Sequence, residues 1–267
     1  RPKQGREITE ARAISELFPD AVLAERVVYE LREVTGDSSY TPSSLVTQSE
    51  LDLITDMHLY AELYDGNVIL EQEESVDVSG IGHLRNLRSL TIDEYGVGGG
   101  WSEITTLANL THLYFVDCWN IEEQELSQLT NVPNLTDLGI YNTYEELLGI
   151  SDVSSLAGLT NLTNLTNLLL EGNQIKDISP LAGLTSTRIY ATNQKVIDSV
   201  KWTPLVEVAN EITGMSGQLE TPSSISNGGE YEDSSIKWED LLNEEQEVSY
   251  VWQDNGVSQS NIYFSGT

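Results

Sequence analysis

Residues 165–184 read LTNLLLEGNQIKDISPLAGL, which fits the pattern L-x-x-L-x-L-x-x-N followed by a return segment. This is the spacing of a leucine-rich repeat, whose period is roughly 20–29 residues. One such unit cannot bury its apolar edge alone, so several units must stack into a curved solenoid. The stretch therefore predicts parallel strands along a concave face and short 3-10 or irregular segments on the convex side.

Earlier segments repeat this leucine phase. The strand-opening leucines are 23, 25 and 30 residues apart, at Leu87, Leu110, Leu135 and Leu165. We therefore expect parallel strands at 87–92, 110–115, 135–140 and 165–170, within a solenoid of four or five coils. The longer spacings require insertions, so the solenoid is predicted to be short and irregular.

The only cysteine lies at the ninth position of one repeat. In this fold Cys or Asn at that position turns inward and bonds backbone groups of neighbouring coils, so we interpret Cys118 as structural rather than as a reactive thiol. The ninth positions of the four repeats are Tyr95, Cys118, Thr143 and Asn173. With one cysteine the chain has neither a disulfide framework nor a cysteine-based metal site.

A glycine-rich stretch, GVGGGW at residues 96–101, interrupts the second half of one repeat. It contains too much glycine to favour a strand. It also lacks the lysine and the following helix of a phosphate-binding loop. We therefore expect a flexible loop at the rim of the solenoid.

The region before the repeats reads as helical. An apolar cluster begins at Ile14, Asp20 suits a helix N-cap, and Gly36 suits a helix stop. Such helices before leucine-rich repeats indicate a cap, because the first repeat would otherwise expose its core edge. Farther on, Thr47 and Glu50 form a capping-box pattern. The segment that follows, to Leu59, either completes the cap or forms a degenerate first repeat.

The leucine pattern fades after about residue 187, and alternating strands separated by glycine-containing turns follow it. Several short strands at this spacing favour a small β-sandwich. Because no cysteine pair is available, we expect its core to depend on Trp202, Trp238, Tyr250 and Trp252. The predicted strands are 200–202, 205–208, 236–238, 248–252 and 262–264.

Charge and hydropathy exclude several classes of function. The chain has 267 residues and a formal charge of −30, from 43 acids and 13 bases. Nucleic-acid binders need a basic surface, so this composition argues against that class. The acidity suits either attraction of a basic partner or solubility as a monomer. No apolar run is long enough to span a membrane, and any export signal is expected to have been removed already.

Eight segments along the chain follow the order of a known family: 14–24, 46–48, 175–184, 191–195, 222–231, 236–238, 247–250 and 264–267. In these segments the residues resemble the internalins. That resemblance implies a helical cap, leucine-rich repeats and an immunoglobulin-like domain in a secreted or wall-displayed protein of a Gram-positive bacterium. It also implies binding of host proteins through the concave face, with no particular receptor specified.

No catalytic pattern stands out. The three histidines, His58, His83 and His112, have no metal-binding spacing, and no G-x-S-x-G motif occurs. Carboxylate runs at 71–74 and 244–247 are typical of a solvated acidic surface. We therefore predict a protein that is not an enzyme and has no cofactor or metal.

The repeat phase does predict a binding surface. Positions 4 and 6 of each repeat point inward, so positions 3, 5 and 7 lie on the concave side. Tyr114 and Tyr141 then fall in neighbouring repeats, and aromatic anchors with a few polar groups are typical of interface centres. Tyrosine is, however, also simply a good strand former. The predicted partner-binding residues are His112, Tyr114, Val116, Asp137, Tyr141, Leu169 and Glu171.

The sequence thus predicts a helical cap at 1–50, leucine-rich repeats at 51–192 and an immunoglobulin-like sandwich at 193–267. The function we expect is non-catalytic binding or adhesion, outside the cell, with a protein partner such as a host surface protein. Two alternatives remain open: a structural spacer for a missing domain, and a carbohydrate-binding module that uses Tyr and Trp as stacking platforms.

Overall fold

The N-terminal part of the chain contains three helices and a two-stranded antiparallel sheet. The computed structural model describes residues 7–60, 75–254 and 261–267. The Asp20 carboxylate accepts hydrogen bonds from the backbone of Val22 and Leu23, and Gly36 ends the helix at φ 73°, so both predicted boundaries are confirmed. Thr47 and Glu50 form the predicted capping box. The elements are β1 (Arg12–Ala13), α1 (Ile14–Leu17), α2 (Ala21–Thr35), β2 (Leu45–Val46) and α3 (Gln48–Leu51).

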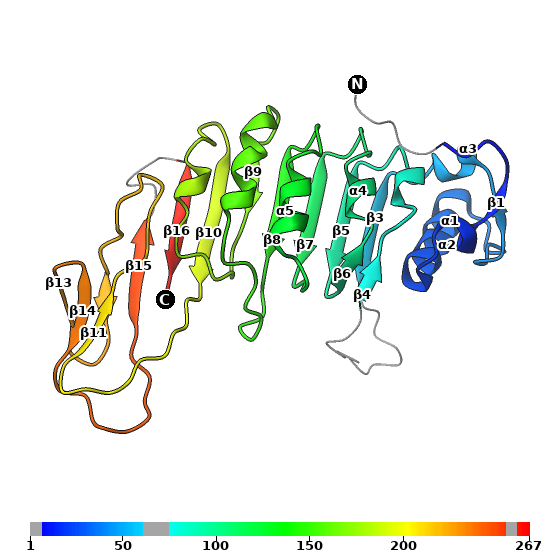
Figure 1. The fold of residues 1–267 in the computed structure, drawn as a ribbon. Helices are drawn as coiled ribbons and strands as arrows, with labels where there is room; N and C mark the ends of the chain where they lie inside the picture. Colours follow the sequence, from blue (N-terminus) through cyan, green and yellow to red (C-terminus); the bar gives the residue numbers. More distant parts are fainter. Residues whose placement is uncertain (1–6, 61–74, 255–260) are drawn as a thin grey trace.

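A parallel sheet forms the body of the molecule (Figure 1). All four predicted strands are present, and their opening leucines are buried. Neighbouring strands pair in register, with Leu90 beside Leu113, Leu113 beside Leu138, and Leu138 beside Leu168. In sheet order the repeat strands are β3 (Asp56–Tyr60), β5 (Ser89–Asp93), β7 (His112–Val116), β8 (Asp137–Tyr141), β9 (Asn167–Leu169) and β10 (Arg188–Gln194).

The described residues thus contain six repeat strands, so the expectation of four or five coils was too low. At the start, Met57 and Leu59 occupy inward positions opposite Leu90 and Ile92, which makes β3 a degenerate first repeat. At the end, Ile189 lies opposite Leu168 and is fully buried. This strand crosses the predicted domain boundary between residues 192 and 193 and carries no leucine, and so the leucine pattern misses it.

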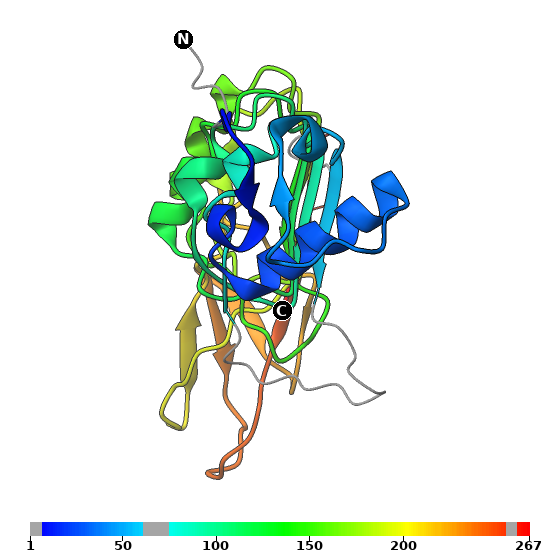
Figure 2. The ribbon, with the colours of Figure 1, turned by 90° about the vertical axis from the view of Figure 1, so that its right-hand side faces the viewer.

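Short helices cover one side of the sheet and leave the other side open (Figure 2). We call the surface built by positions 3, 5 and 7 of the repeats the open face. Apolar side chains at positions 4 and 6 point the opposite way, into one continuous core with the helices. The covering segments are η1 (Ile81–His83), α4 (Trp101–Ile104), α5 (Glu123–Leu129), η2 (Ser154–Asn161) and η3 (Ser179–Leu181).

Inward polar side chains join successive coils at the ninth position. The Cys118 thiol donates to the carbonyl of Ile92 in the previous coil at 3.2 Å, and burial raises its pKa to about 12. The prediction of a structural cysteine is confirmed. Asn173 is fully buried and donates to the carbonyl of Ile140 at 2.8 Å. Gln194 does the same one coil later, donating to the carbonyl of Leu170 at 2.8 Å.

The glycine-rich stretch is not a loop, and this prediction was wrong. Residues Gly96–Gly99 form strand β6, which pairs in parallel with β4 (Ser75–Asp77). Glycine is required because the Trp119 indole packs against this backbone: a Cβ on Gly96 would lie 2.5 Å from its Nε1. The helix α4 follows directly, and its Trp101 is buried and stacks on Phe115 at 4.9 Å. Backbone pairing and aromatic packing thus order a segment that composition assigned to the rim.

The C-terminal strands form one small sheet and extend the repeat sheet. One sheet has the order β11–β14–β13, and the other strands, β12, β15 and β16, continue the repeat sheet beyond β10. Val206, Ile236 and Trp238 are buried between them, with Ile225 and Tyr250 packed alongside. The strands are β11 (Val206–Ala209), β12 (Ser224–Ile225), β13 (Glu230–Glu232), β14 (Ser235–Trp238), β15 (Tyr250–Asp254) and β16 (Ile262–Gly266).

Two expectations for this region were wrong. Residues 200–202 do not form a strand. Trp202 is 39% exposed and only donates its indole N–H to the carbonyl of Leu241. The tryptophans Trp238 and Trp252 are buried, but in different clusters, since Trp252 belongs to the repeat core.

Parts of the predicted domains, residues 1–6, 61–74 and 255–260, lie outside the described residues, as does the carboxylate run at 71–74. Among the helices of the described residues, none combines the length and the apolar character needed to cross a lipid bilayer.

Candidate partner-binding surface

All seven predicted partner-binding residues lie on the open face or at its edge and are half-buried. Parallel register aligns them into rows across the strands. His112 lies beside Asp137, and Val116 lies beside Tyr141. Glu171 is the second residue after β9, and its carbonyl accepts the N–H of Asn142, the residue after Tyr141, at 2.9 Å. The predicted strand phase therefore holds throughout this surface.

The two tyrosines converge on one glycine. Gly139 occupies an outward position on β8, yet it is buried. A Cβ at this residue would lie 2.7 Å from a Tyr114 ring carbon and 3.1 Å from ring carbons of Tyr141. The missing side chain thus allows both rings to lie close to the sheet.

Asp137 is the polar centre of this surface. Its carboxylate accepts a hydrogen bond from the Tyr114 hydroxyl at 3.3 Å and one from the Asn167 amide at 3.4 Å. His112 Nε2 lies 3.8 Å from the other carboxylate oxygen. These contacts hold the Tyr114 ring and the imidazole over neighbouring strands.

Burial and nearby carboxylates set the protonation of these groups. Burial, followed by the charge of Asp137, raises the pKa of Tyr114 to about 12. The pKa of Tyr141 is also raised, by burial and then by the charges of Glu171, Asp93 and Asp117. Both phenols are therefore neutral hydrogen-bond donors at physiological pH. Burial also raises the pKa of Glu171, because a carboxylate loses hydration at this position.

Sequence reasoning missed a carboxylate cluster beside Tyr141. Asp93, Glu94 and Asp117 offer oxygens within 4.8 Å of one another, a set that in principle suits a hard cation. Asp117 is buried, but it already accepts hydrogen bonds from the backbone and hydroxyl of Thr143, each at 2.6 Å. Glu94 accepts the hydroxyl of Tyr144. These contacts tie Thr143 and Tyr144, which follow β8, to the neighbouring strands, and the cluster is explained without an ion.

The surface predicted from the sequence also ended too early along the chain, before β10 and β16. Tyr190 of β10 lies beside Leu169, and Tyr263 of β16 lies beside Tyr190. The available signal was Gln194, which stands five residues after the inward Ile189 just as Asn173 stands five residues after Leu168. Without an inward leucine, that phase was not recognised.

Residues 217–267 match a family model described as LRR adjacent. Solved structures that resemble this chain include an internalin C2 (inlC2) from Listeria monocytogenes, with 21% identity, a TM-score of 0.42, and coverage of 72% of this chain and 92% of that one. An internalin (inlF) from the same organism has 25% identity, a TM-score of 0.39, and coverage of 72% and 61%. The resemblance to the internalins is confirmed.

A secreted internalin-like protein of Listeria monocytogenes, Lmo2445, is 16% identical, with a TM-score of 0.40 and coverage of 76% of this chain and 75% of that one. No curated protein matches the sequence. The chain spans 61% of the length of the inlF structure. The leucine-rich-repeat fold of this chain is shown by its own parallel strands and their buried inward side chains.

Proposed function

We propose that this internalin-like chain is a non-catalytic binding module that recognises a protein partner through the open face. The observation that carries the proposal is the pair of half-buried tyrosines that share the floor provided by Gly139. Each ring offers a large and stiff apolar surface with a hydroxyl at its tip, and it gains contact area while few torsions are ordered. Asp137 and Glu171 beside the rings supply charge for orientation.

The surroundings we propose for this module follow from the resemblance. The helices α1 to α3 act as a cap on the first repeat, and the C-terminal strands form an immunoglobulin-like domain. The protein works as a monomer outside the cell, secreted or held at the wall, and a host surface protein is its partner. Support comes from the internalin-like relatives, one of which is described as secreted, and from the two-sheet arrangement around Trp238.

The test has two stages. The chain is first screened against host surface proteins and against glycan arrays. A glycan hit without a protein hit would favour carbohydrate binding, and silence in both screens would favour the spacer.

Any protein hit is then measured with Tyr114→Ala combined with Tyr141→Ala. We expect affinity to fall by about 2–4 kcal/mol, in the range of interface anchors, with little change in melting temperature. Tyr29→Ala is the matched control, because Tyr29 is 43% exposed and lies on α2. Unchanged binding in the double variant would remove the open face from the proposal.

A further inference from the structure

The open face does not end where the repeats end. The last strand of the chain, β16, pairs in parallel with β10, with Ile189 beside Ile262 and Tyr190 beside Tyr263. Ile262 and Phe264 are fully buried in the same core as the repeat leucines. Because alternate residues of a strand point to opposite faces, Tyr263 lies on the same face as Tyr190 and Leu169.

The register therefore extends one row of side chains into the C-terminal region. In strand order from β7 to β16, this row is Tyr114, Gly139, Leu169, Tyr190 and Tyr263. The last two rings stack with centroids 5.7 Å apart and planes 9° from parallel. Tyr263 is nevertheless 38% exposed. The stacked pair thus holds apolar ring surface at a fixed place and leaves part of it available to a partner.

Carboxylates border this row. Asp137 lies beside Asn167 in the neighbouring row, and Glu171 follows the end of β9. In the part of the chain that the structure describes, neither carboxylate forms an ion pair with a lysine or an arginine. The only basic side chain near Asp137 in that part is His112, whose Nε2 lies 3.8 Å from the carboxylate. Burial raises the pKa of Glu171, so its charged form would gain from a cation. The whole chain carries a formal charge of −30, which attracts cationic partners at long range.

One cation stands in the row of Asp137 and Asn167. Arg188 lies beside Asn167 in the register of β10 and is exposed. In the part of the chain that the structure describes, its guanidinium forms no ion pair with a carboxylate. Arg188 therefore does not neutralise Asp137 or Glu171.

We propose that the partner surface crosses from the repeats onto β16, and that its occupant is an arginine- or lysine-bearing segment of a protein. The segment's cationic groups pair with Asp137 and Glu171, and the aliphatic stems of its arginine or lysine side chains cover Tyr190 and Tyr263. This rests on the proposed function, since it assigns chemistry to the same open face. It differs in one respect: the C-terminal region contacts the partner instead of acting only as a support.

The test uses isotope-labelled chain and the decapeptide (Arg-Gly)5, with (Glu-Gly)5 as the charge control and chitohexaose as the carbohydrate control. NMR shifts are mapped as each probe is added. We expect (Arg-Gly)5 to move the signals of residues 137–141, 167–171, 188–192 and 262–264 together, while (Glu-Gly)5 and chitohexaose leave them in place. A response confined to residues 112–171 would overturn the inference and leave the proposed function intact. No response on the open face, an equal response to (Glu-Gly)5, or a response to chitohexaose alone would overturn it as well.

Single substitutions distinguish a loss of contact with the peptide from a loss of folding. Tyr263→Ala and Glu171→Gln are each expected to weaken (Arg-Gly)5 binding by about 3- to 10-fold, a loss of roughly 0.7–1.4 kcal/mol. Tyr29→Ala should leave it unchanged. Glu171→Gln keeps the shape of the side chain, so it remains informative if the loss of the stacked ring destabilises β16. Unchanged binding in a folded Tyr263→Ala variant would contradict the proposal, and the partner-binding test of Tyr114 and Tyr141 would still stand on its own.

Discussion

At its N-terminal end the repeat sheet stops at β3, whereas at its C-terminal end it runs on through β10 into β16. Both ends face the same problem, because a terminal repeat strand exposes backbone donors and acceptors and an apolar core edge. At the N-terminal end helix α2 contacts β3, whereas the C-terminal end gains further strands. The two solutions use different kinds of contact and should therefore respond differently to mutation.

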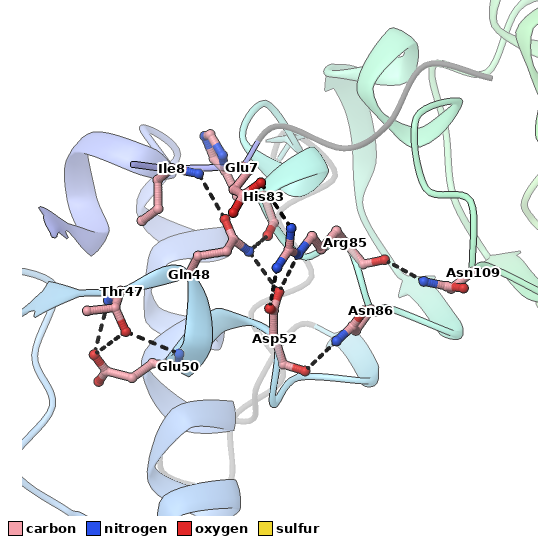
Figure 3. Close-up of polar contacts among 10 residues, drawn as sticks. All are labelled: Glu7, Ile8, Thr47, Gln48, Glu50, Asp52, His83, Arg85, Asn86 and Asn109. Carbon is pink, nitrogen blue, oxygen red and sulfur yellow. Dashed lines mark hydrogen bonds and ion pairs between the residues drawn. The ribbon is translucent and has the colours of Figure 1, made fainter. Parts of the chain in front are cut away.

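Side chains make the polar connection at the N-terminal end (Figure 3). Arg85 donates two hydrogen bonds to the Asp52 carboxylate, at 2.8 and 2.7 Å. Gln48 donates to Asp52 and to the carbonyl of His83, each at 2.9 Å. Asn86 then donates to the carbonyl of Asp52 at 3.1 Å. Loss of the Asp52 carboxylate removes three of these five hydrogen bonds.

Backbone and core make the connection at the C-terminal end. Besides the pairing of β10 with β16, the buried Trp252 packs edge-on against Phe264 at 5.5 Å. On the covered side of the sheet, the N–H of Ile178 donates to the carbonyl of Thr213 at 3.1 Å. Here the junction and the core are the same structure, so we expect it to open only as a unit.

The substitution Trp252→Ala gives the largest expected effect and tests the difference between the two ends of the sheet. The ring is 1% exposed, so its removal should cost about 3–5 kcal/mol, in the range of large-to-small changes of buried aromatics. Urea unfolding followed by fluorescence and circular dichroism measures this. We expect both signals to shift together, because the ring belongs to the repeat core.

Trp252→Phe is the matched control. It keeps a ring and removes an indole N–H that has no hydrogen-bond partner within the described residues, so its cost should be clearly smaller. If Trp252→Ala leaves the main transition in place and only adds a separate early one, the C-terminal strands unfold independently and the two ends are more alike than we infer.

At the other end, Asp52→Ala should have an intermediate effect of about 1 kcal/mol, because hydrogen bonds between charged groups lose strength at partly exposed sites. The effect should also depend on pH. The hydrogen bonds from Arg85 lower the pKa of Asp52 below its ordinary 3.8. The folded state then favours the ionised form, so the contribution is full above that ordinary value and is lost as the pH falls through the lowered one.

Hydrogen exchange of α3 and of residues 83–86, compared between the wild type and Asp52→Ala, measures this prediction. Asp56→Ala is the control, since the Asp56 side chain is exposed on the neighbouring strand and accepts only from Thr55. A loss of protection that reaches β16 would show that the N-terminal contacts are not local.

The smallest effect is expected midway between the ends. Burial raises the pKa of Glu171 above its ordinary 4.5, so the folded state holds its proton more tightly than the unfolded state does. Stability is then lost as the pH rises from the ordinary value through the raised one. Glu171→Gln removes this penalty and should stabilise the chain at neutral pH by a few tenths of a kcal/mol, discounted for solvent exposure.

Thermal melts of Glu171→Gln and wild type at pH 4 and pH 7 measure the difference, which should appear only at the higher pH. Glu123→Gln on the exposed side of α5 serves as the control. Equal stability at both pH values would contradict the account of a desolvated carboxylate on the open face.

Local signals in the sequence were sufficient for much of this fold. The leucine phase identified four strands and the direction of their side chains, since burial of one face leaves little freedom in register. Asp20, Gly36 and the pair Thr47 with Glu50 marked helix ends through chemistry that acts over three or four residues. Cys118 was recognised because its position in the repeat fixed its environment.

The failures share a cause, which is dependence on distant partners. β6 contains three glycines and exists because β4 pairs with it and the Trp119 indole needs close backbone approach. Trp202 looked like a core residue, but the strand expected around it does not form. β10 has no leucine, and its burial follows from its neighbours on both sides. Composition within one segment carries none of this information.

The candidate site was predictable to the same extent. The rows of the open face followed from the strand phase, so Tyr114 and Tyr141 were placed side by side. The close packing of both rings against Gly139 was not predictable, because it depends on the orientations of two side chains from different coils. Tyr263 could not be assigned to the open face from the sequence, because it lies beside Tyr190 only through the pairing of β10 with β16, which spans most of the C-terminal region.

That pairing also has a consequence for the order in which the chain assembles. Neighbouring strands β5 and β7 pair residues 23 positions apart, Ser89 with His112, whereas β10 and β16 pair residues 73 positions apart, Ile189 with Ile262. By polymer scaling, closing the longer loop costs about 1 kcal/mol more in chain entropy. Contacts of large sequence separation form slowly, so β16 closes the sheet last. Until then the nascent chain presents β10 as an open edge, the kind of edge at which strands from different molecules pair.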